Sequence, residues 1–233
     1  MKVLLVSTSL LVLLNGCPAF AQKAPTSLTL PNLPSTPTTI EKTTTTTAAP
    51  VDLPPEECLR RVHNIAPLMP KIMEGARTAI SAIVPDPDGY EKTLPTLEKV
   101  LADKDAKTLM NIGGLSEAFY YAGNKEKGQK LFKFFCDNAD SILGAEHPFP
   151  GLVKGDVGLL FFTEKNYAEA EPLLLDSLKK LETNMTAANS NNLITNYMCL
   201  SLINDEGGNK EKALSYAKKM VDLSLKLRTE PLK

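Results

Sequence analysis

The stretch Gly123-Asn124-Lys125-Glu126-Lys127 occurs a second time, unchanged, as Gly208-Asn209-Lys210-Glu211-Lys212. A weaker third copy, Lys165-Asn166-Tyr167-Ala168-Glu169-Ala170, lies between them. The small residues Gly128, Ala170 and Ala213 mark the three copies and are 42 and 43 positions apart (170 − 128 and 213 − 170). A fixed period of this length is typical of stacked helical hairpins. The sequence therefore predicts an all-α protein built from repeated pairs of helices.

Apolar residues on both sides of each copy recur at spacings of three and four, which is the helical period. No alternating strand pattern of useful length occurs. The spacings place three hairpins at about residues 107–143, 151–181 and 191–228. Residues 71–102 carry a similar stripe, interrupted by Pro85-Asp86-Pro87-Asp88-Gly89, and are expected to form a divergent first hairpin.

The hairpins share a further pattern: a small and an aromatic residue in the first helix, a turn, and a small residue early in the second helix. This pattern resembles the tetratricopeptide repeat, over about residues 107–228 and more weakly over 71–102. The matching residues are Leu115-Ser116…Phe119…Gly123…Gly128…Phe132 and Val157-Gly158…Phe161…Asn166…Ala170…Leu174. The segment 167–174 is similar to the long-repeat variety of kinesin light chains. Gly128 departs from the usual Ala, and the period exceeds the common 34 residues.

The resemblance implies a right-handed α-solenoid whose leading helices line a concave groove for a partner protein or peptide. Carried over by position, the groove residues would be Tyr120, Tyr121, Phe162 and Asn196. Aromatic and amide side chains suit this role because they offer planar apolar area and hydrogen bonds to a peptide backbone. The alternative for Tyr120 and Phe162 is a place in the core between repeats. Gly113-Gly114 leaves a similar choice between close helix packing and room for a ligand backbone.

The N-terminus has the pattern of an export signal, expected over residues 1–21. Lys2 precedes a short apolar run, and Ala19-Phe20-Ala21 has the small-x-small form of a cleavage site. The run is too short to span a bilayer as a stable helix. Cys17 lies in a lipoprotein-like box, so acylation there is the alternative to cleavage after Ala21. The protein is expected to be secreted or periplasmic, and to reach a membrane only if Cys17 is lipidated.

Residues 22–54 are rich in Pro and Thr and include the run Thr43 to Thr47. Such a segment buries too little apolar surface to offset its ordering entropy, so we expect a disordered linker there. Order is expected to begin near Asp52, a candidate helix cap that is followed by prolines suited to a first helical turn. The repeat domain is then expected to occupy residues 55–233.

The rest of the composition favours neither catalysis nor nucleic-acid binding. The formal net charge is −1, with both signs interspersed, so no nucleic-acid partner is expected. His63 and His147 share no spacing with Cys or acidic clusters, so we expect no metal, cofactor or catalytic residue. Cleavage after Ala21 leaves Cys58, Cys136 and Cys199; an exported protein could oxidise two of them, and small buried hydrophobes are the other interpretation.

The sequence thus predicts a non-enzymatic protein-interaction scaffold that acts outside the cytoplasm. Two alternatives stay open. The chain could be a structural subunit that self-associates or joins an envelope complex without a peptide ligand. It could also be an enzyme whose site the sequence does not reveal.

Overall fold

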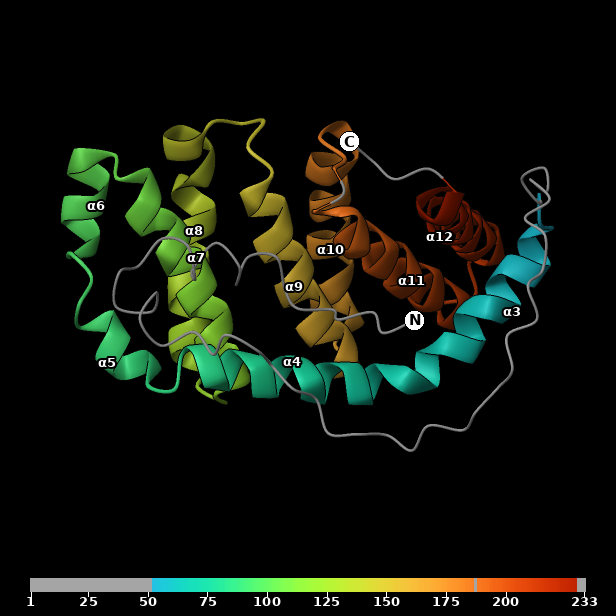
Figure 1. The fold of residues 1–233 in the computed structure, drawn as a ribbon, viewed down its shortest axis with the longest axis horizontal. Coiled ribbons are helices and arrows are strands. Elements are labelled where there is room, and N and C mark those ends of the chain that lie inside the picture. Colours follow the sequence, from blue (N-terminus) through green and yellow to red (C-terminus); the bar gives the residue numbers. More distant parts are fainter. Residues whose placement is uncertain (1–51, 187, 230–233) are drawn as a thin grey trace, which may run out of the picture.

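The computed structural model describes residues 52–186 and 188–229. The predicted export signal (1–21) lies outside these residues, as does the predicted linker (22–54) except for residues 52–54. The described part of the chain consists of helices and connecting turns, without a strand, which confirms the predicted all-α class (Figure 1).

Six long helices form three antiparallel pairs. These are α7 (Ala106–Tyr121) with α8 (Lys125–Leu143), α9 (Phe149–Thr163) with α10 (Tyr167–Thr183), and α11 (Ser190–Glu206) with α12 (Lys210–Thr229). Each pair packs on the next pair in chain order, mainly through contacts of α7 with α9 and of α11 with α9 and α10. Figure 1 shows the three pairs side by side along the long axis of the molecule. We call α7, α9 and α11 the leading helices.

The repeated phrase forms the turn between the two helices of each pair. The turn residues with positive φ are Gly123 (84°), Lys165 (59°) and Gly208 (78°), at the 42- and 43-residue spacing of the sequence repeat. In each turn the following asparagine donates its backbone N–H to the carbonyl five residues earlier. Glycine adopts positive φ readily, whereas a residue with a side chain is strained by roughly 1–2 kcal/mol there. The same turn geometry therefore recurs with the sequence period. In the second hairpin it strains the backbone at Lys165, where the other two turns have glycine.

Small residues let the two helices of a pair approach closely. A Cβ on Gly128 would lie 2.9 Å from the ring of Tyr120, and a Cβ on Gly158 would lie 3.0 Å from Leu174. Ala170, at the position equivalent to Gly128, is fully buried. A larger side chain at these points would overpack the hairpin, and interiors of native density do not absorb such volume without strain.

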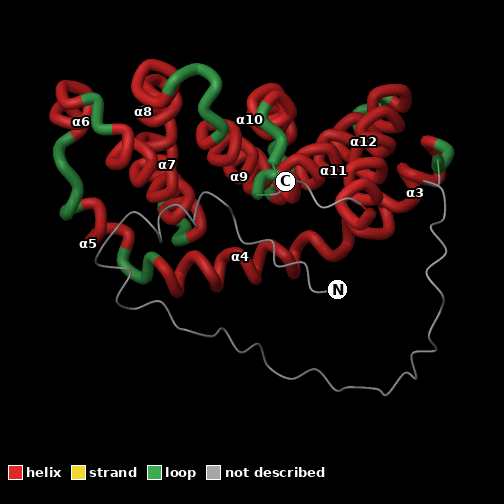
Figure 2. Tube along the Cα trace, turned by 45° about the horizontal axis from the view of Figure 1, so that its top comes forward, coloured by secondary structure: helices red, strands yellow, loops and turns green. Residues whose placement is uncertain are grey.

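The helices before the first pair follow a different plan. α3 (Pro55–Ile65), the 3₁₀ turn η1 (Ala66–Leu68) and α4 (Met69–Ile83) form a long segment, here called the strap. The strap runs along one side of the array of pairs, from α12 at one end to α7 at the other (Figures 1 and 2).

Residues 71–102, expected to be a first hairpin, hold most of α4 together with α5 (Pro87–Glu91) and α6 (Leu97–Asp103). All three helices pack on α7. This arrangement differs from the two-helix hairpin that the sequence predicted, because the apolar stripe of α4 lies against the leading helix α7 rather than against a partner that follows it.

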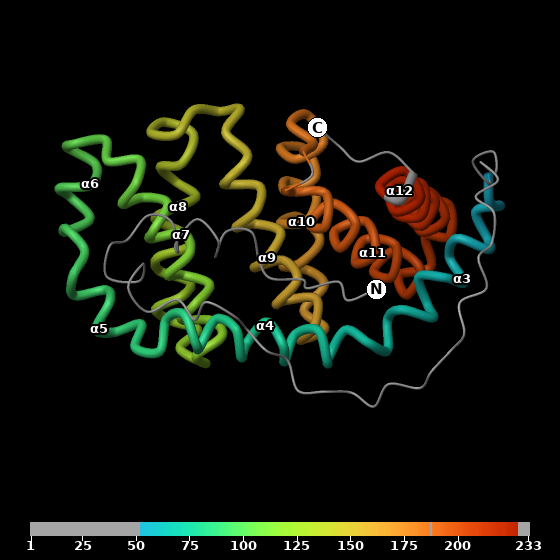
Figure 3. Tube along the Cα trace, viewed as in Figure 1, coloured from blue at the N-terminus to red at the C-terminus, as the bar shows by residue number. Residues whose placement is uncertain are grey.

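The start of the described chain closes the far end of the array. α3 buries Cys58, Leu59 and Val62 and packs on α12 and α11. It takes the place that a next leading helix would take, since α11 packs on α10 and α9 in the same way. Asp52, predicted as a helix cap, instead pairs with Lys218 of α12 at 2.7 Å. Figure 3 shows α3 next to α12, although the two are distant in sequence.

Candidate functional site

The four residues predicted to line a groove all lie on the leading helices, and all four are buried. Tyr120 is 9% exposed, Tyr121 6%, Phe162 9% and Asn196 1%. In this arrangement they leave little area for a partner, and whether they bind one stays a prediction. Their neighbours differ, and the differences separate packing residues from a candidate site.

Tyr120 and Phe162 pack within the helical core. The ring of Tyr120 covers Gly128 and meets Phe161 edge-on, with the ring centroids 6.0 Å apart. Burial raises the pKa of Tyr120 to about 12. Phe162 lies against Tyr167 with the centroids 5.6 Å apart. These contacts agree with the alternative that the two side chains fill space between helices.

Asn196 belongs to a buried hydrogen-bond chain that joins three helices. Its Nδ2 donates to Ser177 Oγ at 2.7 Å, and Ser177 Oγ donates to the carbonyl of Gly151 at 2.6 Å. Ser177 is fully buried. Buried polar groups need such partners, because an unpaired one costs about 1–3 kcal/mol. Asn196 therefore fixes α11 against α10 and α9.

Gly113 is likewise explained by packing. A Cβ at this position would lie 3.0 Å from Phe135 and 3.2 Å from Phe149. The rings of Phe135 and Phe149 meet edge-on with centroids 5.8 Å apart. The space beside Gly113 is filled by aromatic side chains from α8 and α9 and holds no room for a ligand backbone.

Tyr121 differs from the other three because charged groups of other helices, one of them in the strap, act on its phenol. Burial raises the pKa of the Tyr121 phenol well above its usual range. The carboxylates of Asp156 and Glu117 raise this pKa further, whereas the guanidinium of Arg77 lowers it. The Tyr121 phenol is thus within electrostatic range of charged groups on α7, α9 and the strap helix α4, although the Arg77 side chain itself is exposed.

A second contact between strap and leading helices lies at the other end of the array. His63 of α3 and Asp205 of α11 are joined by a 2.8 Å contact between Nε2 and Oδ2. Lys210 approaches the other oxygen of Asp205 at 2.9 Å. The Lys210 ammonium, and then His63, hold the pKa of Asp205 below its usual range.

Asp205 was missed by the sequence reasoning, although a signal was present. It lies 43 residues after Phe162, which lies 42 residues after Tyr120. The repeat period therefore puts all three at one position of the leading helix. We call Glu117, Tyr121, Asp156 and Asp205 the strap-facing residues, because Asp205 contacts the strap and because Glu117, Asp156 and Arg77 of the strap all act on the Tyr121 phenol.

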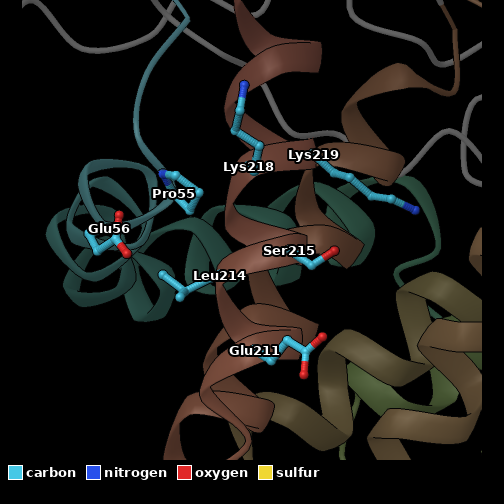
Figure 4. Close-up of a pocket in the computed structure, with 7 residues that line it drawn as sticks. All are labelled: Pro55, Glu56, Glu211, Leu214, Ser215, Lys218 and Lys219. Carbon is cyan, nitrogen blue, oxygen red and sulfur yellow. The ribbon is translucent and has the colours of Figure 1, made fainter.

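An open depression of about 370 Å³ lies between α3 and α12. Its lining residues are Pro55, Glu56, Glu211, Leu214, Ser215, Lys218 and Lys219 (Figure 4). Lys218 is committed to ion pairs with Asp52 and Asp222, both at 2.7 Å. The remaining lining mixes an apolar pair with charges of both signs, and no set of groups converges on one point.

The three cysteines of the described residues are free thiols. Burial raises the pKa of Cys136 to about 11 and shifts that of Cys199 upward as well. Burial also raises the pKa of Cys58. Raised values disfavour the thiolate, which is the nucleophilic form. These side chains behave as small buried hydrophobes.

No three His, Cys, Asp or Glu side chains among the described residues gather closely enough to hold a metal ion. None of their helices has both the length and the apolar character that crossing a bilayer requires.

Comparison of the chain with family models, with curated proteins and with solved structures yields no match. The resemblance to tetratricopeptide repeats therefore stays a prediction from the sequence of this chain.

Proposed function

We propose that this chain is a non-enzymatic helical-repeat module of the tetratricopeptide type, a right-handed α-solenoid that binds a partner protein or peptide. The observation that carries the proposal is the packing of three similar helical pairs in chain order, with their leading helices on a common side. One hairpin cannot cover its own apolar faces, so repeats of this kind stack and present an extended surface. Such surfaces recognise peptides and helices.

Two features of this chain support a repeat array in particular. The positive-φ turn residue recurs at spacings of 42 and 43, as the sequence period requires. Small residues at Gly128, Gly158 and Ala170 sit where paired helices cross closely. Both features belong to the leading-helix and turn pattern from which the resemblance was drawn.

Export is part of the same proposal and rests on the sequence of residues 1–21. Mass spectrometry of the N-terminus of the mature chain tests it. A first residue of Gln22 supports a soluble exported protein, and an acylated Cys17 supports a membrane-tethered one. An intact Met1 in cells that cleave a control signal peptide would contradict export.

The binding proposal is tested by selecting peptides from a displayed random library with the full mature chain. We expect a shared motif to recur in independent selections and to be competed by the free peptide. Failure to enrich any motif over an unrelated helical protein would contradict the proposal.

Self-association is the structural alternative, and α3 bears on it. Since α3 packs on α12 and α11, a second copy could not extend the array at that end without displacing it. Light scattering across concentration separates the two ideas. A constant monomer mass is expected, and growth of the mass with concentration would favour the structural alternative.

A further inference from the structure

Within the strap, α4 is held far less firmly than α3. α3 buries three of its 11 residues against the third hairpin, whereas α4 buries only Met69 and Ile80 among its 15. The Thr78 hydroxyl of α4 donates to the carbonyl of Glu74 in α4 itself. Little buried apolar area is a sign of a segment that opens locally at low free energy.

Both ends of α4 are nonetheless anchored. On one side α3 is fixed to α12, and His63 is paired with Asp205. On the other side Lys127 of α8 holds Glu91 of α5 at 2.8 Å and also contacts Asp88. Val84, directly after α4, is buried.

The junction between α3 and α4 is suited to bending. Pro67 and Pro70 remove two backbone donors there, and residues 66–68 form a 3₁₀ turn. Ile65 and Leu68 are 37% and 50% exposed, so movement at this point sacrifices little core. A helix of 15 residues is about 22 Å long. The same residues extended reach about 50 Å, so α4 can leave the surface while both anchors stay in place.

α4 presents a regular face to α7. Its apolar residues that are buried or pack against the core are Met69, Ile72, Met73, Ala76, Ile80 and Ile83. These positions, at spacings of one, three and four, form one stripe of a helix. Arg77, beside this stripe, acts on the Tyr121 phenol, and the carboxylates Glu117 and Asp156 act on the same phenol. An amphipathic helix with a basic residue thus packs on α7, and the buried acids Glu117 of α7 and Asp156 of α9 act on the same phenol as that basic residue.

We propose that the surface beneath α4 is a docking site for an amphipathic helix of a partner protein, and that α4 occupies it as an exchangeable part of the chain. This inference rests on the proposed binding function and names its ligand class. The partner helix carries apolar residues with the α4 spacing and an Arg or Lys in the place of Arg77. Recognition is helix-in-groove binding, with Glu117 and Asp156 selecting a basic helix.

Exchange of this kind lowers the apparent affinity of the partner in a defined way. A site that is open in only a small fraction of molecules binds a ligand more weakly by that fraction. A change that releases α4 therefore strengthens binding without altering the site. Ile80→Asp is such a change, because it places a charge at the best-buried apolar position of α4. Ser81→Asp, at an exposed neighbour, adds the same charge without this effect and is the matched control.

The test measures binding of a labelled synthetic peptide with the sequence of residues 69–84 to the full mature chain. We expect the Ile80→Asp chain to bind at least about ten-fold more tightly than wild type, and the Ser81→Asp chain to match wild type. A peptide with Glu in place of Arg77 should bind the Ile80→Asp chain more weakly than the unchanged peptide. Equal binding to all three chains, or no binding to a folded Ile80→Asp chain, overturns the inference.

Hydrogen exchange on the wild-type chain keeps the inference testable if Ile80→Asp fails to fold. Backbone amides of α4 should exchange faster than those of α3 and α7. Equal protection in the three helices overturns the inference. A motif enriched from the peptide library by a chain that does not bind the α4 peptide would leave the binding function standing and reject only the helix ligand. Enrichment of no motif, with wild type or variant, rejects both.

Discussion

α7 and α4 are helices of similar length, 16 and 15 residues, but their surroundings differ. In α7 every residue from Thr108 to Tyr121 is buried except Met110. In α4 only one residue near each end is buried. The first helix is enclosed by its partner α8, by α9 and by α4 to α6, whereas α4 touches the array along one side. The comparison shows that a repeat array can have a firm interior and a loosely held cover in one chain.

The largest expected effect is on the free energy of unfolding, when one side chain in the interior of the array and one in α4 are each truncated to Ala. Phe135→Ala removes a fully buried ring that packs against Phe149, and should lower the free energy of unfolding by about 3–5 kcal/mol. Ile72→Ala in the half-buried face of α4 should cost less than about 1 kcal/mol. Urea denaturation measures both. Similar losses for the two variants would break the distinction between firm interior and loose cover.

A smaller effect is expected where polar groups join the hairpins. Asn196→Ala breaks the chain from α11 through Ser177 to Gly151 and should cost about 1–3 kcal/mol. The exposed Asn191→Ala on the same helix is the control and should change stability by less than about 0.5 kcal/mol. A neutral Asn196→Ala would mean that this hydrogen-bond chain does not hold the second and third hairpins together.

The three turns offer a change that stabilises. Lys165 has a φ of 59°, whereas the equivalent residues of the other two turns are glycines. Lys165→Gly should therefore raise stability by about 0.5–1 kcal/mol, and Gly123→Ala should lower it by a similar amount. Thermal unfolding of both variants checks the signs. A destabilising Lys165→Gly would show that the three turns are not equivalent.

The smallest effect concerns pH at the connection between the first two hairpins. Burial, and then Lys180, lower the pKa of His147, so the folded state favours neutral imidazole. The backbone N–H of Phe149 also donates to Nδ1 of His147 at 3.2 Å, which requires an unprotonated nitrogen. The stability that this group contributes is fully present above about pH 6.5, the pKa of imidazole in the unfolded chain, and is lost as the pH falls from there through the lower pKa of the folded state.

Thermal unfolding at about pH 7.5 and 5.5 should therefore show a larger loss for wild type than for His147→Asn, because Asn keeps an acceptor and does not titrate. An equal loss in both proteins would assign the pH dependence to other groups.

The sequence was informative where its residues repeat. The all-α class followed from spacings of three and four, and the turns followed from the phrase that begins at Gly123 and Gly208. These are local signals, because turn geometry and helical periodicity depend on neighbours in the chain. The period also linked Tyr120, Phe162 and Asp205, although only the first two were selected as site residues.

The position of the strap could not be predicted from such local signals. α3 contacts α12 about 150 residues away, and a single apolar stripe does not say which surface will cover it. The sequence prediction paired α4 with the helices that follow it in the chain, whereas in the structure α4 packs on the leading helix α7. Tyr121 is buried, and no pattern within α7 signals it.

Zero-length carbodiimide cross-linking of the monomer, mapped by mass spectrometry, tests the central claim most directly. That claim is a set of hairpins packed in chain order and closed by α3. The account predicts links of Lys125 to Glu164, Lys180 to Asp140 and Lys219 to Glu182 between successive hairpins, and of Lys218 to Asp52 at the closed end. Links between the first and third hairpins, with the Lys218–Asp52 link missing, would contradict it.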